Sequence, residues 1–182
     1  DGIGVNGTEL VSGLNEGLPD GVGVSGGLAG DGADFGSTWV LVDGRPESGF
    51  VTAVGVYGAV QVNAGSRGGW SPFGIERRIT RSEGNRVYAI DGQPALALYQ
   101  RYLGERASEL PAAGLLFPLE LVRRRGEAGV VRTILGIDEA TQSLTFAGDL
   151  PEGSRVRLMA STHAGLVHGA REAAASCHDQ AP

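Results

Sequence analysis

Residues 76–104 read ERRITRSEGNRVYAIDGQPALALYQRYLG, and this stretch decides the fold class. Its first half contains two runs with the composition of β-strands, Glu76–Arg81 and Arg86–Ile90. Between them stands Glu83-Gly84-Asn85, a group of residues that favours a tight turn. The two runs therefore predict a β-hairpin.

The second half of the same stretch has the pattern of a helix. Asp91 is expected to cap the helix, and Pro94 is expected in its first turn, where proline is well tolerated. Leu96, Tyr99 and Leu103 recur on one helical face before Gly104, a typical helix stop. A hairpin followed at once by an amphipathic helix predicts a mixed α/β fold of the α+β class.

Working outward toward the N-terminus, the sequence predicts a helix and then short strands. Asn6 with Glu9 resembles a capping arrangement, and Leu10, Val11, Leu14 and Leu18 then share one face of a helix that ends near Gly17. Asp43-Gly44 is a strong hairpin turn. The expected strands in this half are Val22–Val24, Thr38–Val42, Phe50–Tyr57 and Val60–Ala64.

Toward the C-terminus we expect a small antiparallel sheet closed by a helix over 161–175, with Leu166, Val167, Ala170 and Ala174 at helical spacing. We therefore expect two lobes, residues 1–92 and residues 93–182, each of largely antiparallel sheet with packed helices. A short helical piece, Arg106–Leu110, and the apolar runs Leu115–Val122, Val130–Leu135, Leu144–Ala147 and Val156–Ala160 supply the second lobe.

Composition excludes several classes of function. The chain of 182 residues carries a net charge of −6, which disfavours a nucleic-acid partner, and the basic run Arg123–Arg125 reads as a solvated turn. No lysine is present, so Schiff-base chemistry and a P-loop lysine are ruled out. Cys177 is the single cysteine, and no apolar run is long enough to span a membrane. We expect a soluble cytoplasmic protein whose natural chain begins upstream of Asp1.

One glycine-rich stretch matches two catalytic or cofactor motifs in form only. Gly21–Gly26 fits the dinucleotide pattern G-x-G-x-x-G, and Gly23–Gly27 fits the G-x-S-x-G pattern around a serine nucleophile. Both motifs require a helix directly afterwards, but the glycines that follow do not favour one. A serine hydrolase that uses Ser25 with His163 or His168 nevertheless stays open as an alternative.

The histidines do not predict a metal centre. His163 and His168 are five residues apart, or about 140° around a helix, so they cannot bind one metal ion from the same face. The sequence thus supplies no metal site and no cofactor, and apart from the Ser25 alternative it presents no catalytic residues.

Two loops are candidates for ligand binding. Consecutive unhindered amides over 26–32 can form an anion-binding nest, and Arg67 beside Trp70 can hold a carboxylate next to an aromatic platform. The predicted ligand-binding residues are Ser25, Gly26, Gly27, Asp31, Arg67 and Trp70.

Four segments taken in order resemble one family. They are Gly26–Asp31, Gly68–Gly74, Thr80–Asn85 and Asp91–Leu96 followed by Tyr99. Together they resemble the FIST family, named for F-box and intracellular signal-transduction proteins. In this resemblance residues 1–92 are similar to the later part of the FIST N-terminal domain, and 93–182 to the beginning of the FIST C-terminal domain.

The resemblance implies a sensory module that binds a small ligand, with amino acids or related metabolites as expected ligands, and that works beside other signalling domains or proteins. It supplies no catalytic set. The early part of the N-terminal domain and the closing part of the C-terminal domain are not matched, so a pocket shared by two lobes would be incomplete in this chain. A protein-interaction scaffold without a small ligand stays open as a further alternative.

Overall fold

The computed structural model describes residues 1–123 and 129–178, and it has a mixed α+β fold built on antiparallel sheet. Part of the arginine run at 123–125 and the last four residues lie outside this description. The helices are α1 (Gly7–Gly17), α2 (Ala95–Leu103) and α3 (His163–His178), with the 3-10 turns η1 (Gly104–Glu109) and η2 (Ala112–Leu115). The strands are β1 (Val40–Val42), β2 (Arg45–Glu47), β3 (Trp70–Glu83), β4 (Arg86–Ile90), β5 (Gln93–Pro94), β6 (Leu119–Leu121), β7 (Val130–Arg132), β8 (Ile134–Asp138), β9 (Ser143–Phe146) and β10 (Arg155–Ser161).

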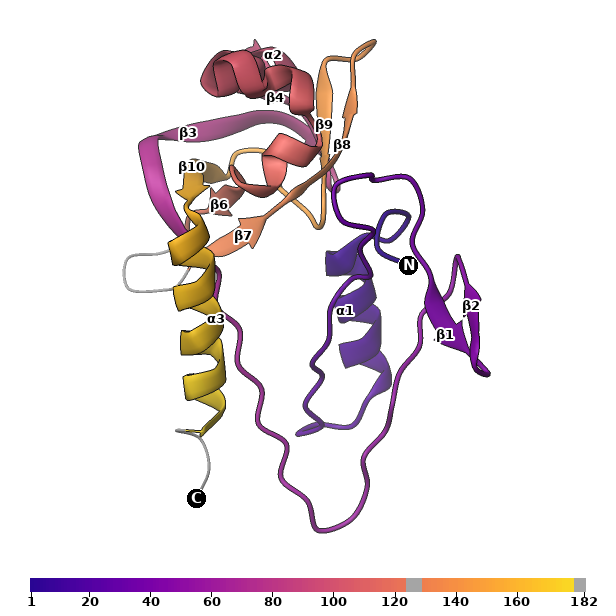
Figure 1. Ribbon diagram of the computed structural model, residues 1–182. Coiled ribbons are helices and arrows are strands. Elements are labelled where there is room, and N and C mark those ends of the chain that lie inside the picture. The colour runs from indigo at the N-terminus through magenta and orange to yellow at the C-terminus, as the bar shows by residue number, and fades with distance from the viewer. Residues whose placement is uncertain (124–128, 179–182) are drawn as a thin grey trace.

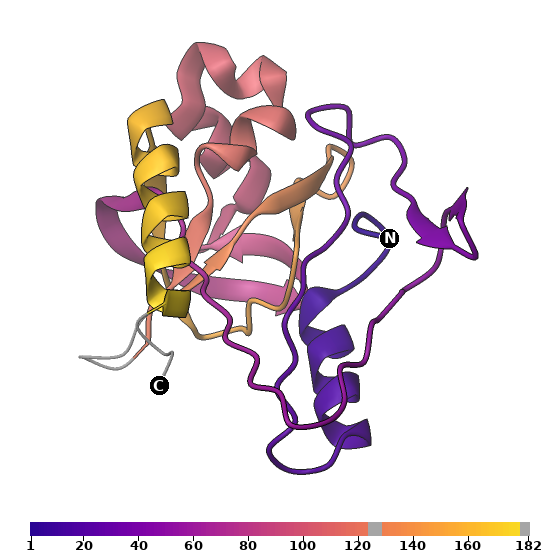
Figure 2. The same ribbon diagram turned by 60° about the horizontal axis from the view of Figure 1, so that its bottom comes forward.

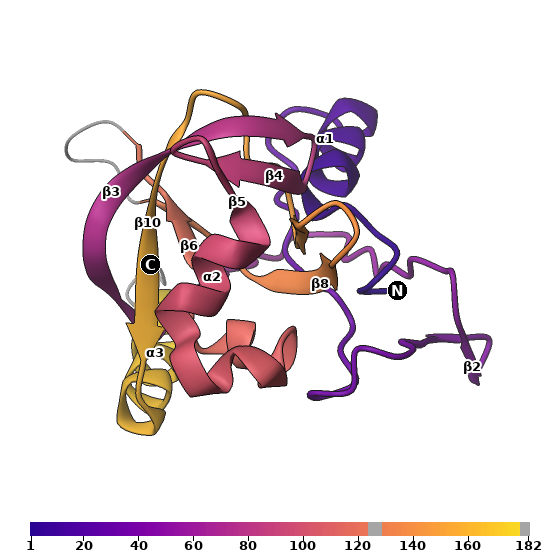
Figure 3. The ribbon, with the colours of Figure 1, turned by 90° about the horizontal axis from the view of Figure 1, so that it is seen from above.

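A curled sheet forms the centre of the molecule, with the strand order β7-β6-β10-β3-β4-β9-β8 and with β5 paired to β4. Strand β3 is long enough to pair with β10 along its first half and with β4 along its second (Figure 1). Its register against β10 shifts between Pro72 and Glu76, where Gly74 adopts a φ of 78°. Such a bulge bends a strand, and β3 is seen to curve strongly from above (Figure 3). The sheet unites strands from both sides of residue 92.

The predicted hairpin and the helix after it are confirmed, and they form the hydrophobic core. Strands β3 and β4 turn at Gly84-Asn85, and α2 ends at Gly104, which has a φ of 57°. The predicted face of α2 is buried: Leu96, Tyr99 and Leu103 pack on the concave side of the sheet against Ile79, Val87, Ile90, Leu144, Phe146 and other apolar side chains.

One detail of the helix prediction is wrong. Asp91 does not cap α2, because Pro94 precedes the helix and Asp91 lies in the turn between β4 and β5 with a φ of 50°. Its carboxylate accepts a hydrogen bond from the backbone N–H of Arg78 at 2.8 Å instead. Asp91 therefore ties its turn to β3.

Helix α1 forms as predicted, but it packs weakly. The Asn6 side chain accepts from the Thr8 N–H at 3.0 Å, which is the expected cap, and no residue of the helix is buried. The start of α1 is joined to the sheet through Asp149, whose carboxylate accepts from Asn6 and whose N–H donates to the Thr8 hydroxyl. Arg132 also donates to that hydroxyl, at 3.1 Å. Polar contacts rather than apolar packing hold α1 in place.

Of the strands predicted before residue 65, only the one that ends at Val42 is formed, and it pairs with Arg45–Glu47, which was not predicted as a strand. The β1–β2 hairpin turns at Asp43-Gly44 with φ values of 50° and 77°, as expected. Residues 22–24, 50–57 and 60–64 form no strand, and this prediction is wrong for the structure. Their apolar side chains are exposed, with Val54 at 92% and Tyr57 at 91%, because no neighbouring strand covers them. Figure 2 shows the segment around residues 50–64 running along the outside of the molecule.

Helix α3 is present, but most of its predicted packing face is exposed and only Leu166 of that face is half-buried. Val167 is 60% exposed, and Ala170 and Ala174 also face outward. Beside Leu166, the side toward the chain is made of small residues, and Gly169 is buried against the backbone of Gly68 and Gly69. Hydrophobicity alone misplaced this face because the contact depends on the absence of side chains.

Candidate functional site

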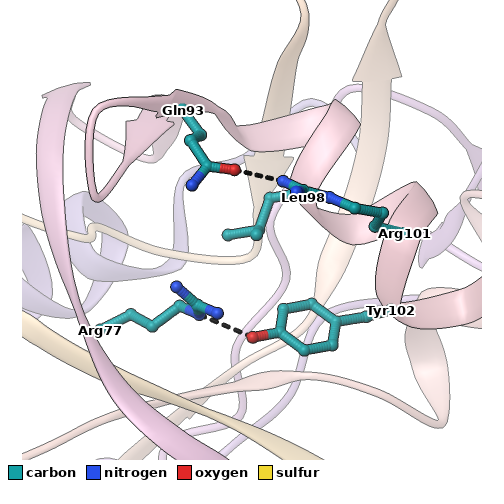
Figure 4. A pocket seen from close by; sticks show the side chains of 5 residues that line it. All are labelled: Arg77, Gln93, Leu98, Arg101 and Tyr102. Carbon is teal, nitrogen blue, oxygen red and sulfur yellow. Dashed lines mark hydrogen bonds between the residues drawn. The ribbon is translucent and has the colours of Figure 1, made fainter.

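A shallow pocket lies between β3 and the β5–α2 segment, with a cavity volume of about 230 Å³. It is lined by Arg77 from β3, Gln93 from β5, and Leu98, Arg101 and Tyr102 from α2 (Figure 4). The last three share one face of α2 because they are three and four residues apart. Two polar pairs therefore flank Leu98, which is only 4% exposed.

Arg77 is held from two directions. Its Nε donates to the Tyr102 hydroxyl oxygen at 2.6 Å, and its Nη1 donates to Asp91 Oδ2 at 2.8 Å. The guanidinium carbon lies 5.4 Å from the centre of the Tyr102 ring, within cation–π range. These contacts fix the guanidinium, while its other N–H groups remain available to a ligand.

The same contacts shift two pKa values. The pKa of Asp91 is lowered below its ordinary value of 3.8, first by the Arg78 N–H and then by the Arg77 guanidinium. The pKa of Arg77 is raised by its hydrogen bonds to Asp91 and Tyr102. Both groups stay charged near neutral pH, so the Arg77–Asp91 pair is neutral as a unit.

Arg101 forms the second polar pair, since its Nη2 donates to the side-chain oxygen of Gln93. This partner is a neutral amide, so the positive charge of Arg101 is not compensated within the lining. The pocket thus presents a net positive charge beside the ring of Tyr102 and the side chain of Leu98. Such a lining suits an anionic group joined to a small apolar body.

The residues predicted from the glycine loop are exposed, except for Asp31, which is half-buried and structural. Ser25, Gly26 and Gly27 lie on the surface. The Asp31 carboxylate accepts hydrogen bonds from the backbone N–H groups of Phe35, Gly36 and Ser37 at 2.7–3.2 Å, and these bonds lower its pKa. A cluster of amides near the predicted position therefore exists, but the chain's own carboxylate occupies it.

Arg67 and Trp70 each donate a hydrogen bond to a backbone carbonyl oxygen in this structure. Arg67 donates to the carbonyl oxygen of Ser66 at 3.2 Å, and Trp70 Nε1 donates to the carbonyl oxygen of Leu115 at 3.1 Å. Residues 65–70 run along α3, whereas residues 20–30 run beside α1 (Figures 1 and 2). The two groups of predicted site residues are not brought together.

The histidines of the hydrolase alternative are likewise remote from the serine. Both lie on α3, and Figures 1 to 3 place α3 and the segment that contains Ser25 on opposite sides of the molecule. His168 pairs with Glu172 of the same helix, at 3.4 Å. Within the described residues, His, Cys, Asp and Glu side chains form no group of three that could hold a metal ion. No helix in that part of the chain has the length and apolar character needed to cross a membrane.

Comparison with models of known protein families shows to which family the chain belongs. A model of the FIST N domain matches residues 1–93, and a model of the FIST C domain matches residues 95–181. The chain belongs to the FIST family. FIST domains are sensory domains of signal transduction. Searches among curated proteins and among solved structures find no match.

The pocket spans both FIST matches. Arg77 and Gln93 belong to the FIST N match, whereas Leu98, Arg101 and Tyr102 belong to the FIST C match. Sequence reasoning missed all five residues because Arg77 lies far from Tyr102 along the chain. The one local signal was the spacing of Leu98, Arg101 and Tyr102, which places them beside the buried face of α2.

Proposed function

We propose that this FIST chain is a cytoplasmic signal-transduction module that senses a small ligand, an amino acid or a related small carboxylate, and has no catalysis of its own. The observation that carries the proposal is the pocket between β3 and α2, in which Arg101 supplies an uncompensated positive charge. The membership in a family of sensory domains supports the same function.

The placement of the pocket supplies a route from binding to signalling. Arg77 belongs to the long central strand, and Arg101 belongs to the helix that follows residue 92. A ligand held by both would tie β3 to α2 and favour the arrangement in which they lie close together. The shift is limited by the difference in affinity between the two arrangements. The output passes to other signalling domains or proteins, with no nucleic acid or membrane as partner.

The residues predicted from sequence stay within this proposal as a second binding region. Ser25, Gly26, Gly27 and Asp31 form one part of it, and Arg67 with Trp70 forms the other. The two lobes, 1–92 and 93–182, would have to change their arrangement to bring these parts together. The pocket at Arg77 needs no such change.

A thermal-shift screen against amino acids, short carboxylates and nucleotides tests the proposal. A ligand that binds only the folded state raises the melting temperature as its concentration increases. We expect a shift with carboxylates that is lost in Arg101→Ala and kept in Arg67→Ala. A shift that is lost only in Arg67→Ala would move the site to the loop predicted from sequence, and no shift with any compound at millimolar concentration would contradict ligand sensing.

A protein-interaction scaffold is the second candidate, and one observation favours it. Large apolar side chains are exposed along residues 50–62: Phe50, Val51, Val54, Val56, Tyr57, Val60 and Val62. Exposed apolar side chains gathered in this way mark interaction surfaces in many proteins. In that case substitutions in this segment, and none in the pocket, would abolish association with a partner.

A further inference from the structure

Residues 1–64, which we call the arm, make contacts among themselves but hardly pack on the sheet. Gly2 and Thr38 are the buried residues of the arm, and they contact each other, because the Gly2 N–H donates to the Thr38 hydroxyl oxygen at 2.9 Å. The Thr38 hydroxyl donates to the Asp1 carboxylate at 2.7 Å, and the Thr38 carbonyl oxygen accepts from the Ser48 hydroxyl at 2.7 Å. These bonds join the start of the arm to its middle.

A small group of polar contacts at the start of α1, which we call the clasp, holds the arm on the sheet. Asn6 Nδ2 donates to Asp149 Oδ1 at 2.7 Å, and the Gly7 N–H donates to the carbonyl oxygen of Ala147 at 3.0 Å. Both acceptors follow strand β9. The first part of the clasp therefore joins the N-terminus of α1 to the segment after β9.

The Thr8 hydroxyl is the centre of the clasp. Its oxygen accepts from the Asp149 N–H at 3.0 Å and from Arg132 Nη2 at 3.1 Å. Between residues 1–58 and residues 70–162, the part of the chain that the structure describes forms no other hydrogen bond and no ion pair. The attachment of the arm to the sheet thus depends on a few bonds around one hydroxyl group.

The far end of the arm is fixed separately. Residues 65–69 run along α3, and the Gly69 carbonyl oxygen accepts from the Ser161 hydroxyl. These contacts do not involve the clasp. If the clasp opens, residues 65–69 still hold the chain on α3, and the arm stays attached at this end only.

Arg132 and Asp149 have a second way to satisfy their charges. Arg132 is half-buried and donates to the carbonyl oxygen of Asp149 at 3.1 Å, but it forms no ion pair with any described residue. Burial lowers its pKa below 12.5, and the nearby charge of Asp149 acts in the opposite direction. Departure of the arm would hydrate the guanidinium and release the Asp149 carboxylate from Asn6. The opened clasp therefore offers an ion pair that the closed clasp lacks.

We infer that the clasp is a conformational switch: when it opens, the arm moves away from the sheet as one body, and Arg132 exchanges the Thr8 hydroxyl for the Asp149 carboxylate. This inference goes beyond the proposed function, because the switch needs no ligand in the pocket. A partner that binds the open arm shifts the balance toward the open form, by no more than the difference in its affinity for the two forms.

Distances between spin labels, measured by electron paramagnetic resonance, test the switch in the 182-residue chain. Glu16 in α1, Glu47 in β2 and Glu139 after β8 are exposed, so a cysteine at each position carries a label, two at a time, in a Cys177→Ser background. The Glu16–Glu139 and Glu47–Glu139 distances report on the clasp. The Glu16–Glu47 distance lies within the arm and should stay constant when the clasp opens.

Thr8→Val removes the central hydroxyl and keeps the shape of the side chain. Two donors lose their acceptor, and we expect the ratio of open to closed molecules to rise at least about tenfold, with a longer population in both distances to Glu139. Thr8→Ser keeps the hydroxyl and should behave as the parent protein does. Ser12→Val places a valine at an exposed position of the same helix outside the clasp, and it should leave all three distances unchanged.

Asp149→Asn, added to Thr8→Val, tests the exchange of partners. The amide oxygen still accepts from Asn6 in the closed form, but it cannot form the ion pair of the open form. We expect the open fraction to fall back toward that of the parent protein. Circular dichroism checks that every variant is folded.

The outcomes distinguish the steps of the inference. An unchanged short distance in Thr8→Val, or a longer distance that appears equally in Ser12→Val, would overturn the switch. A Glu16–Glu47 distance that broadens together with the others would mean that the arm unfolds instead of moving as one body. An open fraction that Asp149→Asn leaves unchanged would reject the exchange of partners.

Discussion

At the scale of single residues, the Arg77–Asp91 pair makes part of the stability depend on pH. A carboxylate whose pKa is lowered in the folded state stabilises the protein above its unfolded pKa, and this contribution disappears as the pH falls through the folded pKa. The pKa of Asp91 is lowered from 3.8, so the loss occurs in the acid range below that value. Because the pair is partly exposed, its contribution is modest.

The substitution Asp91→Asn tests this. Asparagine tolerates the φ of 50° at this position, so the change removes the charge and one of the two acceptor oxygens without straining the turn. We expect the free energy of unfolding at about pH 7 to fall by about 0.5–1 kcal/mol, and the difference from the parent protein to shrink toward about pH 3. Urea denaturation at both pH values measures this difference in the free energy of unfolding. Asp43→Asn, in the exposed β1–β2 turn with the same φ of 50°, is the control; an equal effect there would assign the loss to the turn conformation.

Tyr99 makes the stability of the folded protein depend on pH in the alkaline range. Its hydroxyl donates to the carbonyl oxygen of Phe117 at 3.1 Å, and burial raises its pKa well above 10.0. A raised pKa favours folding below the unfolded value, and the advantage is lost as the pH rises beyond it. We expect Tyr99→Phe to cost about 1 kcal/mol near neutral pH, from the lost hydrogen bond, and to make the protein less sensitive to alkali than the parent.

Absorbance of the phenolate during an alkaline titration, followed by urea denaturation at each pH, checks the Tyr99 prediction. The ring of Tyr57 is 91% exposed, so Tyr57→Phe is the matched control and should leave both neutral and alkaline stability unchanged. Ionisation of Tyr99 in the folded protein together with the exposed tyrosines would contradict the prediction.

At the scale of elements, the success of the sequence analysis followed local signals. Asn6 predicted the start of α1, Gly84 the β3–β4 turn, and Gly104 the end of α2, because each acts through its own backbone or its nearest neighbours. The strand expected at 50–57 failed for a different reason. A strand needs a partner, and no periodicity within the segment says whether one is present.

The candidate site was hidden from sequence for the same physical reason. Arg77 and Tyr102 meet only because β3 curves and α2 packs on its concave side, so no local spacing connects them. Asp91 was read as a helix cap because aspartate commonly caps helices, but a competing acceptor role toward Arg78 decided its position. The Arg77–Tyr102 contact and the position of Asp91 both depend on contacts between separate elements, which local sequence patterns do not reveal.

The packing of α3 predicts that glycine-to-alanine substitutions have opposite effects on stability in α3 and in α1. A methyl group at Gly169 would lie 2.8 Å from the backbone nitrogen of Gly69, whereas one at Gly13 in α1 would meet no atom within 4 Å. Gly-to-Ala changes in open helix positions stabilise by about 0.5–1 kcal/mol. We expect Gly13→Ala to increase helicity, and Gly169→Ala to loosen α3 from residues 68–69 and lower stability.

Circular dichroism at 222 nm with thermal denaturation measures both glycine variants. Greater stability in Gly169→Ala would show that α3 does not pack on the chain at this glycine. Gly169→Ser, with a slightly larger side chain, should be at least as destabilising as the alanine variant.

At the scale of the whole molecule, packing is distributed unevenly along the chain. The large apolar side chains of the buried core all fall between Ile79 and Met159. Around residues 50–64, by contrast, the apolar side chains are exposed and the backbone forms no sheet ladder. Regions with few buried contacts and solvent-exposed amides open at low free-energy cost. We therefore expect two classes of amide exchange, slow in β3, β4, β9 and β10 and fast throughout 50–64.

Hydrogen exchange followed by mass spectrometry measures this difference, and a charge placed in the fast segment tests its cause. Val54 is 92% exposed, so Val54→Lys should change the free energy of unfolding by less than about 0.5 kcal/mol and reduce self-association at high concentration, because a charge opposes pairing between extended apolar segments. Val87→Lys, at a fully buried position, should instead unfold the core. Slow exchange at 50–64 combined with strong destabilisation by Val54→Lys would mean that this segment is covered in solution, and the scaffold candidate would then gain support over the small-ligand sensor.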